Sequence, residues 1–158
     1  MPVVLRRALL TIAALSIGLV AAGRMGLFTG SRPTDLGVHD GRLKPAPATP
    51  NCVNSQSANG YSTIAPLAYA GDGKIALARL HALLAAMPAA KVIDVRADYI
   101  YAEFSSKWLG FVDDVEFHLD EKAAVIHVRS ASRLGRRDFN VNRQRVEAIR
   151  QALGGAKR

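Results

Sequence analysis

The stretch FVDDVEFHLDEKAAVIHVRS, residues 111–130, alternates apolar and polar side chains on both sides of a short charged segment. Alternation with a period of two is typical of β-strands that bury one face, and the segment DEKA is short enough to form a hairpin turn. We therefore predict two antiparallel strands whose apolar side chains share the face that packs on the core.

Pairing Leu119 with Ala124 across this turn predicts a register for the whole hairpin. The pairs that it places on the core face are Phe117–Ile126, Val115–Val128 and Asp113–Ser130. The pairs on the opposite face, where opposed side chains are close enough for charge pairing, are Glu116–His127 and Asp114–Arg129. The same register sets Tyr101 beside Asp114 and Tyr99 beside Glu116. We expect this second face to be exposed to water.

Two more alternating segments, residues 91–96 and 98–105, precede the hairpin with short connections, which predicts a four-stranded antiparallel meander. Two amphipathic helices flank these strands. The first begins after a capping Asp72 and stops at Pro88, and the second is predicted from Asn142, as its cap, to Leu153. The expected fold class is α+β, with a two-layer arrangement in which both helices cover the apolar face of the four-stranded sheet.

The N-terminal sequence RRALLTIAALSIGLVAAG places Arg6 and Arg7 directly before an uncharged apolar run. A charged start, an apolar run and small residues after it are typical of a secretory signal, and Val20-Ala21-Ala22 would serve as a cleavage site. The residues RMGLF that follow would instead lengthen the run into an uncleaved anchor helix. Because the arginines precede the run, we predict the rest of the chain in the cell envelope. It would be anchored in the inner membrane and face the periplasm, or be exported after cleavage, and nucleic acid is not an expected partner.

Composition divides the chain into four parts. We predict a signal peptide or signal anchor at residues 1–24, a Gly/Pro-rich linker and wrapping loop at 25–60, the α+β domain at 61–154 and a basic tail at 155–158. Cys52 is the only cysteine, so no intramolecular disulfide is available. Its thiol could be a nucleophile, an intermolecular bridge or, most commonly, a small buried group.

Three separate segments, PNCVNSQ, GFVDDVEFHLD and IHVRSASRLGRRDFNVNRQRVEAIR, together resemble domain-of-unknown-function family 1499. The resemblance covers roughly Gly41 to Leu153. Ala46 stands where many members have a cysteine, and RRDFN replaces a more usual turn sequence, so Arg136 and Arg137 are particular to this chain. The family carries no established activity, and the resemblance therefore implies a fold but no reaction.

Basic residues concentrate towards the C-terminal end. The formal net charge is +8, and residues 129–158 hold nine Lys and Arg against Asp138 and Glu147. Arginine, serine and asparagine are interleaved here at a strand end, a turn and a helix start, which suits the binding of carboxylate or phosphate oxygens. The candidate ligand-binding residues are Arg129, Ser130, Ser132, Arg133, Arg136, Arg137, Asn142 and Arg143.

The same residues also have a structural interpretation, in which aspartates pair with arginines and fix the turn. In that interpretation Arg129 pairs with Asp114. The remaining pairs join Arg133 or Arg143 to Asp113 or Asp138. The arginines left free for an anionic surface would then be Arg136, Arg137, Arg150 and Arg158.

Two functional classes are consistent with these patterns. The first is a membrane-tethered or exported binding or assembly module, whose basic region holds an anionic ligand, a lipid headgroup or an acidic protein. The second is an enzyme of unassigned reaction, with a site near Cys52 and the cluster Asp113, Asp114, Arg129 and Arg133. Metal ligation by the side chains on the polar sheet face is less favoured than a solvated face. The residues concerned are Asp114, Glu116, His118 and His127, and we predict no metal and no cofactor.

Overall fold

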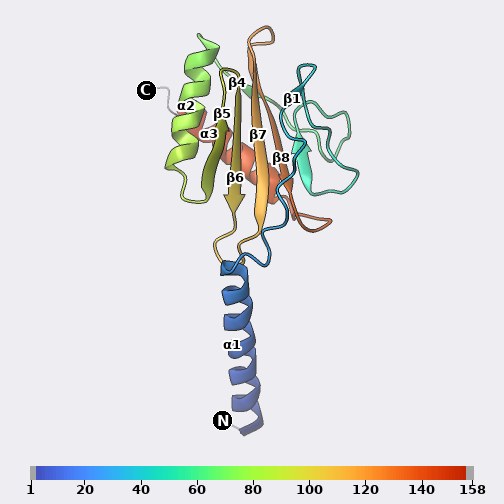
Figure 1. The fold of residues 1–158 in the computed structure, drawn as a ribbon, viewed down its shortest axis with the longest axis vertical. Helices are drawn as coiled ribbons and strands as arrows, with labels where there is room; N and C mark the ends of the chain where they lie inside the picture. The colour runs from blue at the N-terminus through green and yellow to red at the C-terminus, as the bar shows by residue number, and fades with distance from the viewer. Residues whose placement is uncertain (1–2, 156–158) are drawn as a thin grey trace.

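The structure, a computed structural model, describes residues 3–155. Its elements, in chain order, are α1 (Val3–Arg24), β1 (Val38–His39), β2 (Arg42–Leu43), β3 (Cys52–Asn54), β4 (Leu67–Ala68), α2 (Gly73–Ala86), β5 (Ala90–Val95), β6 (Tyr99–Ser105), β7 (Val112–Asp120), β8 (Val125–Ser132) and α3 (Val141–Gly155). Helix α1 projects away from an α+β domain made by the other elements (Figure 1). The predicted fold class and apolar N-terminal helix are confirmed.

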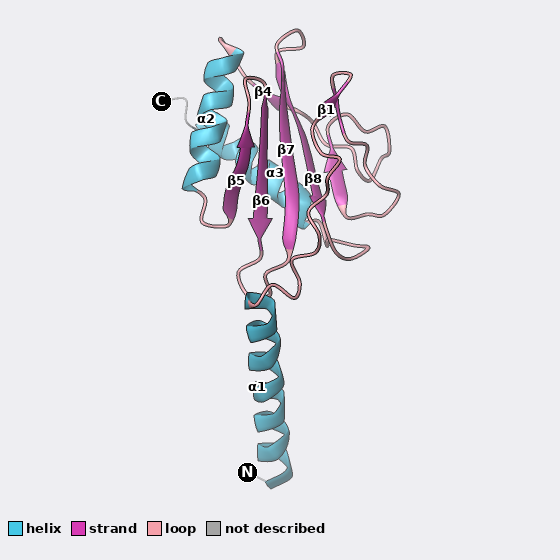
Figure 2. Ribbon diagram, in the orientation of Figure 1, coloured by secondary structure: helices cyan, strands magenta, loops and turns pink. Residues whose placement is uncertain are grey.

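The main sheet is antiparallel and has six strands, not the four that we predicted. The predicted meander is β5 to β8 (Figure 2), and the two extra strands both pair with the outer edge of β8. Strand β3 covers residues 129–131 of β8, and β4 covers residues 125 and 126. Both are short and lack alternation. Strand β3 comes from the predicted linker and wrapping loop, and β4 comes from the start of the predicted domain. Because residues 52–54 belong to the sheet, the ordered domain begins before residue 61.

The middle of this edge is closed by Ser55. Its backbone N–H donates to the carbonyl of Val128, and its hydroxyl accepts from the N–H of Val128, both at 2.9 Å. The side chain thus replaces a missing backbone acceptor between β3 and β4. The outer edge of β8 is therefore covered along most of its length, which protects it from pairing with other chains.

The hairpin register differs from the prediction by two residues. Leu119 lies opposite Ile126, and Asp120 lies opposite Val125. The turn has the predicted length of four residues but lies one residue further along the chain, at residues 121–124, and Ala124 adopts a left-handed φ of 52°. A shift of two keeps every side chain on its predicted face but changes every partner.

Helices α2 and α3 both pack on the apolar face of the sheet, and α3 passes behind the sheet in Figure 1. Asp72 caps α2 as predicted, accepting hydrogen bonds from the N–H groups of Lys74 and Ile75 at 2.7 and 3.0 Å. Ile75, in the first turn of α2, is exposed. The core joins side chains of both helices to those of the central strands, including Leu77, Leu80, Leu84, Ile100, Val115, Phe117, Val128, Val146 and Ile149.

The opposite face of the sheet is covered by residues 31–45, and our prediction that it is exposed to water is wrong. This segment forms the β1–β2 hairpin, which turns at Asp40 and Gly41 with positive φ angles of 52° and 73°. It brings Leu43 against Tyr99 and Tyr101 in a second apolar cluster. The polar side chains of this face are consequently buried, namely Asp114, Glu116, His118 and Arg129.

Helix α1 is long and apolar enough to cross a membrane, a test that signal sequences near an N-terminus also pass. Its last turn packs tightly on the β6–β7 connection. Gly23 is buried there, and a Cβ on it would collide with the backbone carbonyl of Leu109. A Cβ on Gly110 would in turn lie 2.6 Å from the carbonyl oxygen of Gly23. Only glycine permits this approach of two backbones.

Candidate functional site

The buried polar face holds a network of ion pairs centred on two carboxylates of β7. Glu116 is 0% exposed and accepts hydrogen bonds from the N–H of Gly37 at 2.8 Å, the hydroxyl of Tyr99 at 2.9 Å and Nη1 of Arg129 at 3.2 Å. Arg129 therefore pairs with Glu116 and not with Asp114 as predicted. The register explains the difference, because Arg129 lies directly opposite Glu116.

Asp114, the second carboxylate, is paired with Arg133. Nε and Nη2 of Arg133 contact the two carboxylate oxygens at 3.0 and 2.6 Å, and Nη2 also contacts Glu103. The hydroxyl of Tyr101 donates to Asp114 at 2.6 Å. The predicted contacts Tyr101–Asp114 and Tyr99–Glu116 are thus present, since long side chains reach diagonally across neighbouring strands.

Glu103 lies between two arginines. Arg32, from the covering segment, donates to its carboxylate at 2.7 Å, and Arg133, the first residue after β8, also contacts it. Burial acts to raise the pKa of Glu103, but the hydrogen bonds and charges of the two arginines outweigh it and lower the pKa to about 2. Burial and the hydrogen bond to Asp114 raise the pKa of Tyr101, so its hydroxyl remains a donor at neutral pH.

A third set of contacts fixes the start of α3. Nη2 of Arg145 pairs with Asp113 at 2.5 Å, so the predicted partners Arg133 and Arg143 are wrong. Ser130 donates to Asn142 at 2.6 Å, and Asn142 donates to Ser132 at 3.0 Å. Asn142 lies inside the first turn of α3 rather than at its cap, and these three candidate ligand-binding residues bond to one another.

Of the remaining charged residues that we singled out in the sequence, some bond to other parts of the domain and others are exposed. Asp138 accepts from the backbone N–H of Asn142 at 3.0 Å, and its partners are amide and hydroxyl groups instead of the predicted arginine. Arg143 donates to the backbone carbonyls at Tyr61 and Thr63, and Arg150 donates to those of Ala65 and Pro66. Arg150 is therefore not free. Arg136 and Arg137 are exposed, and Arg158 lies outside the described residues.

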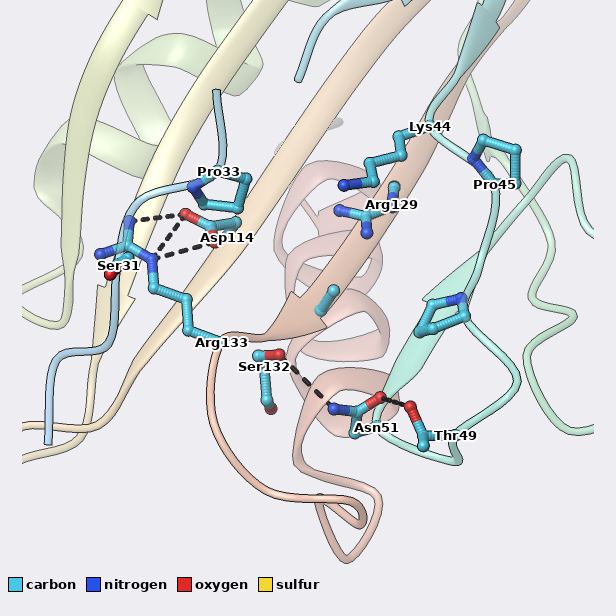
Figure 3. Close-up of a pocket in the computed structure, with 12 residues that line it drawn as sticks. Ser31, Pro33, Lys44, Pro45, Thr49, Asn51, Asp114, Arg129, Ser132 and Arg133 are labelled. Carbon is cyan, nitrogen blue, oxygen red and sulfur yellow. Dashed lines mark hydrogen bonds and ion pairs between the residues drawn. The ribbon is translucent and has the colours of Figure 1, made fainter. Parts of the chain in front are cut away.

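A cleft of about 330 Å³ opens between the covering segment and the end of β8 (Figure 3). Its charged lining residues are Lys44, Arg129, Arg133 and Asp114. Arg129 is only 5% exposed, and within residues 3–155 its guanidinium donates one hydrogen bond to a protein acceptor while Nε has no partner. Arg133 contacts two carboxylates, whereas Arg129 and Lys44 are each paired with one, Glu116 and Asp35, and retain N–H donors for a further acceptor.

Cys52 lies in β3 with 0% exposure. Burial raises the pKa of its thiol to about 11, so the thiol is protonated at neutral pH. We expect the native chain to react with iodoacetamide at neutral pH far more slowly than the same chain in urea. Mass spectrometry of timed samples checks this, and equal rates in both states would show that Cys52 is accessible.

The two histidines of the covered face do not form a metal site. Among residues 3–155, no group of three or more His, Cys, Asp or Glu side chains is placed to hold a metal ion. His118 and His127 stack at 6.2 Å, and arginines occupy the carboxylates of Asp114 and Glu116. His127 also contacts Ser55 at 3.2 Å, but the Ser55 hydroxyl already serves the edge of β8.

The sequence prediction missed Arg32, Lys44, Glu103 and Arg145. The first two stand in a segment with neither helical nor strand periodicity, although its Asp40-Gly41 pair is a strong hairpin signal. Glu103 could have been found by parity, because it shares a sheet face with Tyr99 and Tyr101. Arg145 had no such signal, since its contact with Asp113 depends on how α3 lies across the sheet.

A protein-family match covers most of the chain. A model of a protein family described as "Protein of unknown function (DUF1499)" matches residues 42–153. No curated protein and no solved structure matches the chain. The family match confirms the resemblance that the three sequence segments predicted.

Proposed function

The chain belongs to the DUF1499 family, and from that premise we propose that it is a membrane-tethered binding module that holds the anionic group of a ligand in the cleft beside Arg129. The observation that carries this proposal is the buried, incompletely paired guanidinium of Arg129 in a cleft that Lys44 also lines. The ligand would present a carboxylate or phosphate group, because a planar guanidinium suits the oxygens of both.

The tether is supported by the packing of α1. The apolar run that follows Arg6 and Arg7 is exposed along the helix. Cleavage after Ala22 would remove the helix whose last turn packs on Leu109 and Gly110, so the close contact at Gly23 favours retention. With the arginine pair on the cytoplasmic side, the domain would face the periplasm.

The anion site is supported by the cost of leaving N–H donors of the buried Arg129 without acceptors. A guanidinium carries five N–H donors, and donors that find no acceptor in a buried place lower stability. An anionic group in the cleft would accept from Arg129 and be attracted by Lys44, whose present partner Asp35 is exposed. The enzyme alternative near Cys52 has less support, because the thiol is protonated and Asp113, Asp114 and Arg133 are held in ion pairs.

Thermal denaturation of the full chain in detergent, at constant ionic strength, tests the cleft with inorganic phosphate and with citrate. A bound anion at about 100 times its Kd adds roughly 2.7 kcal/mol, which corresponds to an increase in Tm of about 5–10 °C for a chain of this size. Lys44→Met should lose most of this increase. Lys122→Met, which removes an exposed lysine from the β7–β8 turn, should retain it.

The change in Tm with each anion distinguishes a phosphate ligand from a carboxylate ligand. A response to phosphate alone indicates a phosphate group, and a response to citrate alone indicates a carboxylate. If neither anion raises Tm, or if both variants respond like the wild type, the cleft is not an anion site. Comparison of the variants also removes the general stabilisation that excluded salts give to any folded protein.

A further inference from the structure

Large apolar side chains are exposed where α1 joins the domain. Met25 is 87% exposed, and Leu27 and Trp108 are 68% and 62% exposed. Trp108 stands in the β6–β7 connection, the same loop that packs on Gly23. The β8–α3 connection, residues 133–140, lies at this end of the domain as well and exposes Phe139 (Figure 1). Exposed apolar groups gathered at one end mark an interaction surface.

The length of α1 indicates what this surface meets. The uncharged run from Ala8 to Gly23 is about 24 Å long at the rise of an α-helix. The hydrocarbon core of a bilayer is about 30 Å thick. If Arg7 stays at the cytoplasmic boundary, the part of α1 that follows it ends short of the other boundary. Met25 and Leu27 come next in the chain, and Trp108 stands in the loop that packs on the end of α1.

Basic side chains accompany these apolar groups. Nζ of Lys107 lies 5.3 Å from the ring centre of Trp108, and Arg136 and Arg137 are exposed on the β8–α3 connection. Tryptophan prefers the membrane interface, where its ring is half apolar and half polar. Lysine and arginine near a bilayer are attracted by anionic headgroups. The combination fits an anionic lipid surface, whereas a protein partner would not need to lie in line with α1.

We propose that this end of the domain is a membrane-contact surface, in which Trp108 and Met25 enter the interface and Lys107, Arg136 and Arg137 contact anionic headgroups. The inference rests on the membrane tether of the proposed function and is independent of the anion cleft. Contact of the bilayer with both the β6–β7 and the β8–α3 connections would hold the domain in one orientation, because the close packing at Gly23 joins α1 rigidly to the β6–β7 connection.

Trp108 is the only tryptophan of the chain, so its fluorescence reports on this surface without labelling. The full chain is reconstituted into vesicles of phosphatidylcholine, with or without phosphatidylglycerol, and flotation first measures its association with lipid. In vesicles with phosphatidylglycerol, we expect a blue-shifted emission, quenching by lipids brominated close to the headgroup and reduced quenching by aqueous acrylamide.

Replacing Arg136 and Arg137 by Gln should partly restore the quenching of Trp108 by acrylamide in vesicles with phosphatidylglycerol. The matched control replaces Lys74 and Lys122 by Gln, because both lysines are exposed at the far end of the domain. This control should behave like the wild type. Circular dichroism checks that both double variants remain folded.

The outcomes separate this inference from the tether. If the chain floats with vesicles but Trp108 is as open to acrylamide there as in a water-exposed peptide, the contact surface is wrong and the tether stands. If the chain does not float, the tether fails and the contact surface fails with it. Trp108 could also be equally protected from acrylamide in vesicles with and without phosphatidylglycerol, and remain so in both double variants. That result would show that Arg136 and Arg137 do not contact anionic headgroups.

Discussion

Glu116→Ala is expected to lower the free energy of unfolding by about 3–5 kcal/mol, the usual cost of removing one partner of a buried ion pair. The substitution leaves Arg129 without its carboxylate and the N–H of Gly37 and hydroxyl of Tyr99 without an acceptor. Domains of this size are stable by about 5–15 kcal/mol in total, so the loss is large. Urea denaturation followed by circular dichroism measures it.

Two further variants identify the cause. Glu116→Gln keeps one acceptor oxygen and the side-chain volume, and should therefore lose less stability than Glu116→Ala. Glu121→Ala, at an exposed position in the turn after β7, should change stability by less than about 0.5 kcal/mol. A Glu116→Ala protein as stable as the wild type would show that the covering segment does not depend on this carboxylate.

Arg133→Ala should produce a loss of similar size, about 3–5 kcal/mol at neutral pH, and the loss should depend on pH. In the wild type the folded-state pKa of Glu103 is about 2, below its ordinary value of 4.5. A lowered pKa adds stability above pH 4.5, and this contribution disappears as the pH falls from about 4.5 to about 2. The variant lacks much of this contribution, because Arg133 is one of the two arginines that lower the pKa.

The difference in stability between wild type and Arg133→Ala should therefore be greatest near pH 7 and should narrow as the pH falls through that range. Urea denaturation at a series of pH values from 7 to 3 measures this difference. Arg136→Ala is the matched control, since Arg136 is exposed three positions along the same connection. A difference that stays constant with pH would mean that Arg133 acts through packing alone.

The sequence predicts which face of the sheet each side chain occupies, because successive residues of a strand point to opposite faces. Asp113 and Phe117 were assigned to one face and Asp114 and Glu116 to the other, and the structure agrees. Register could not be predicted in the same way. It depends on which residues form the turn, and nothing in the sequence indicates that the turn would be residues 121–124, with Ala124 in a left-handed conformation.

The partners of the charged residues could be predicted even less well. Opposite charges on one face predict a network, but the choice between Asp114 and Glu116 for Arg129 depends on the two-residue register shift. The covering segment, residues 31–45, could not be predicted for a different reason. Residues 31–45 contact the polar face of the sheet through backbone N–H groups, proline-rich chain and isolated side chains such as Arg32 and Leu43, and these leave no periodic pattern.

The covering segment also constrains the order in which the chain folds. Gly37 and Glu116 are 79 residues apart in sequence, and Arg32 and Glu103 are 71 apart. A chain is synthesised from its N-terminus, so this segment is made early but has no surface to dock on until β6, β7 and β8 have assembled. During that interval the waiting face of the sheet presents carboxylates, tyrosine hydroxyls and arginine to water. A polar face can remain solvated without attracting other unfinished chains, whereas an apolar face left open for the same time would invite aggregation.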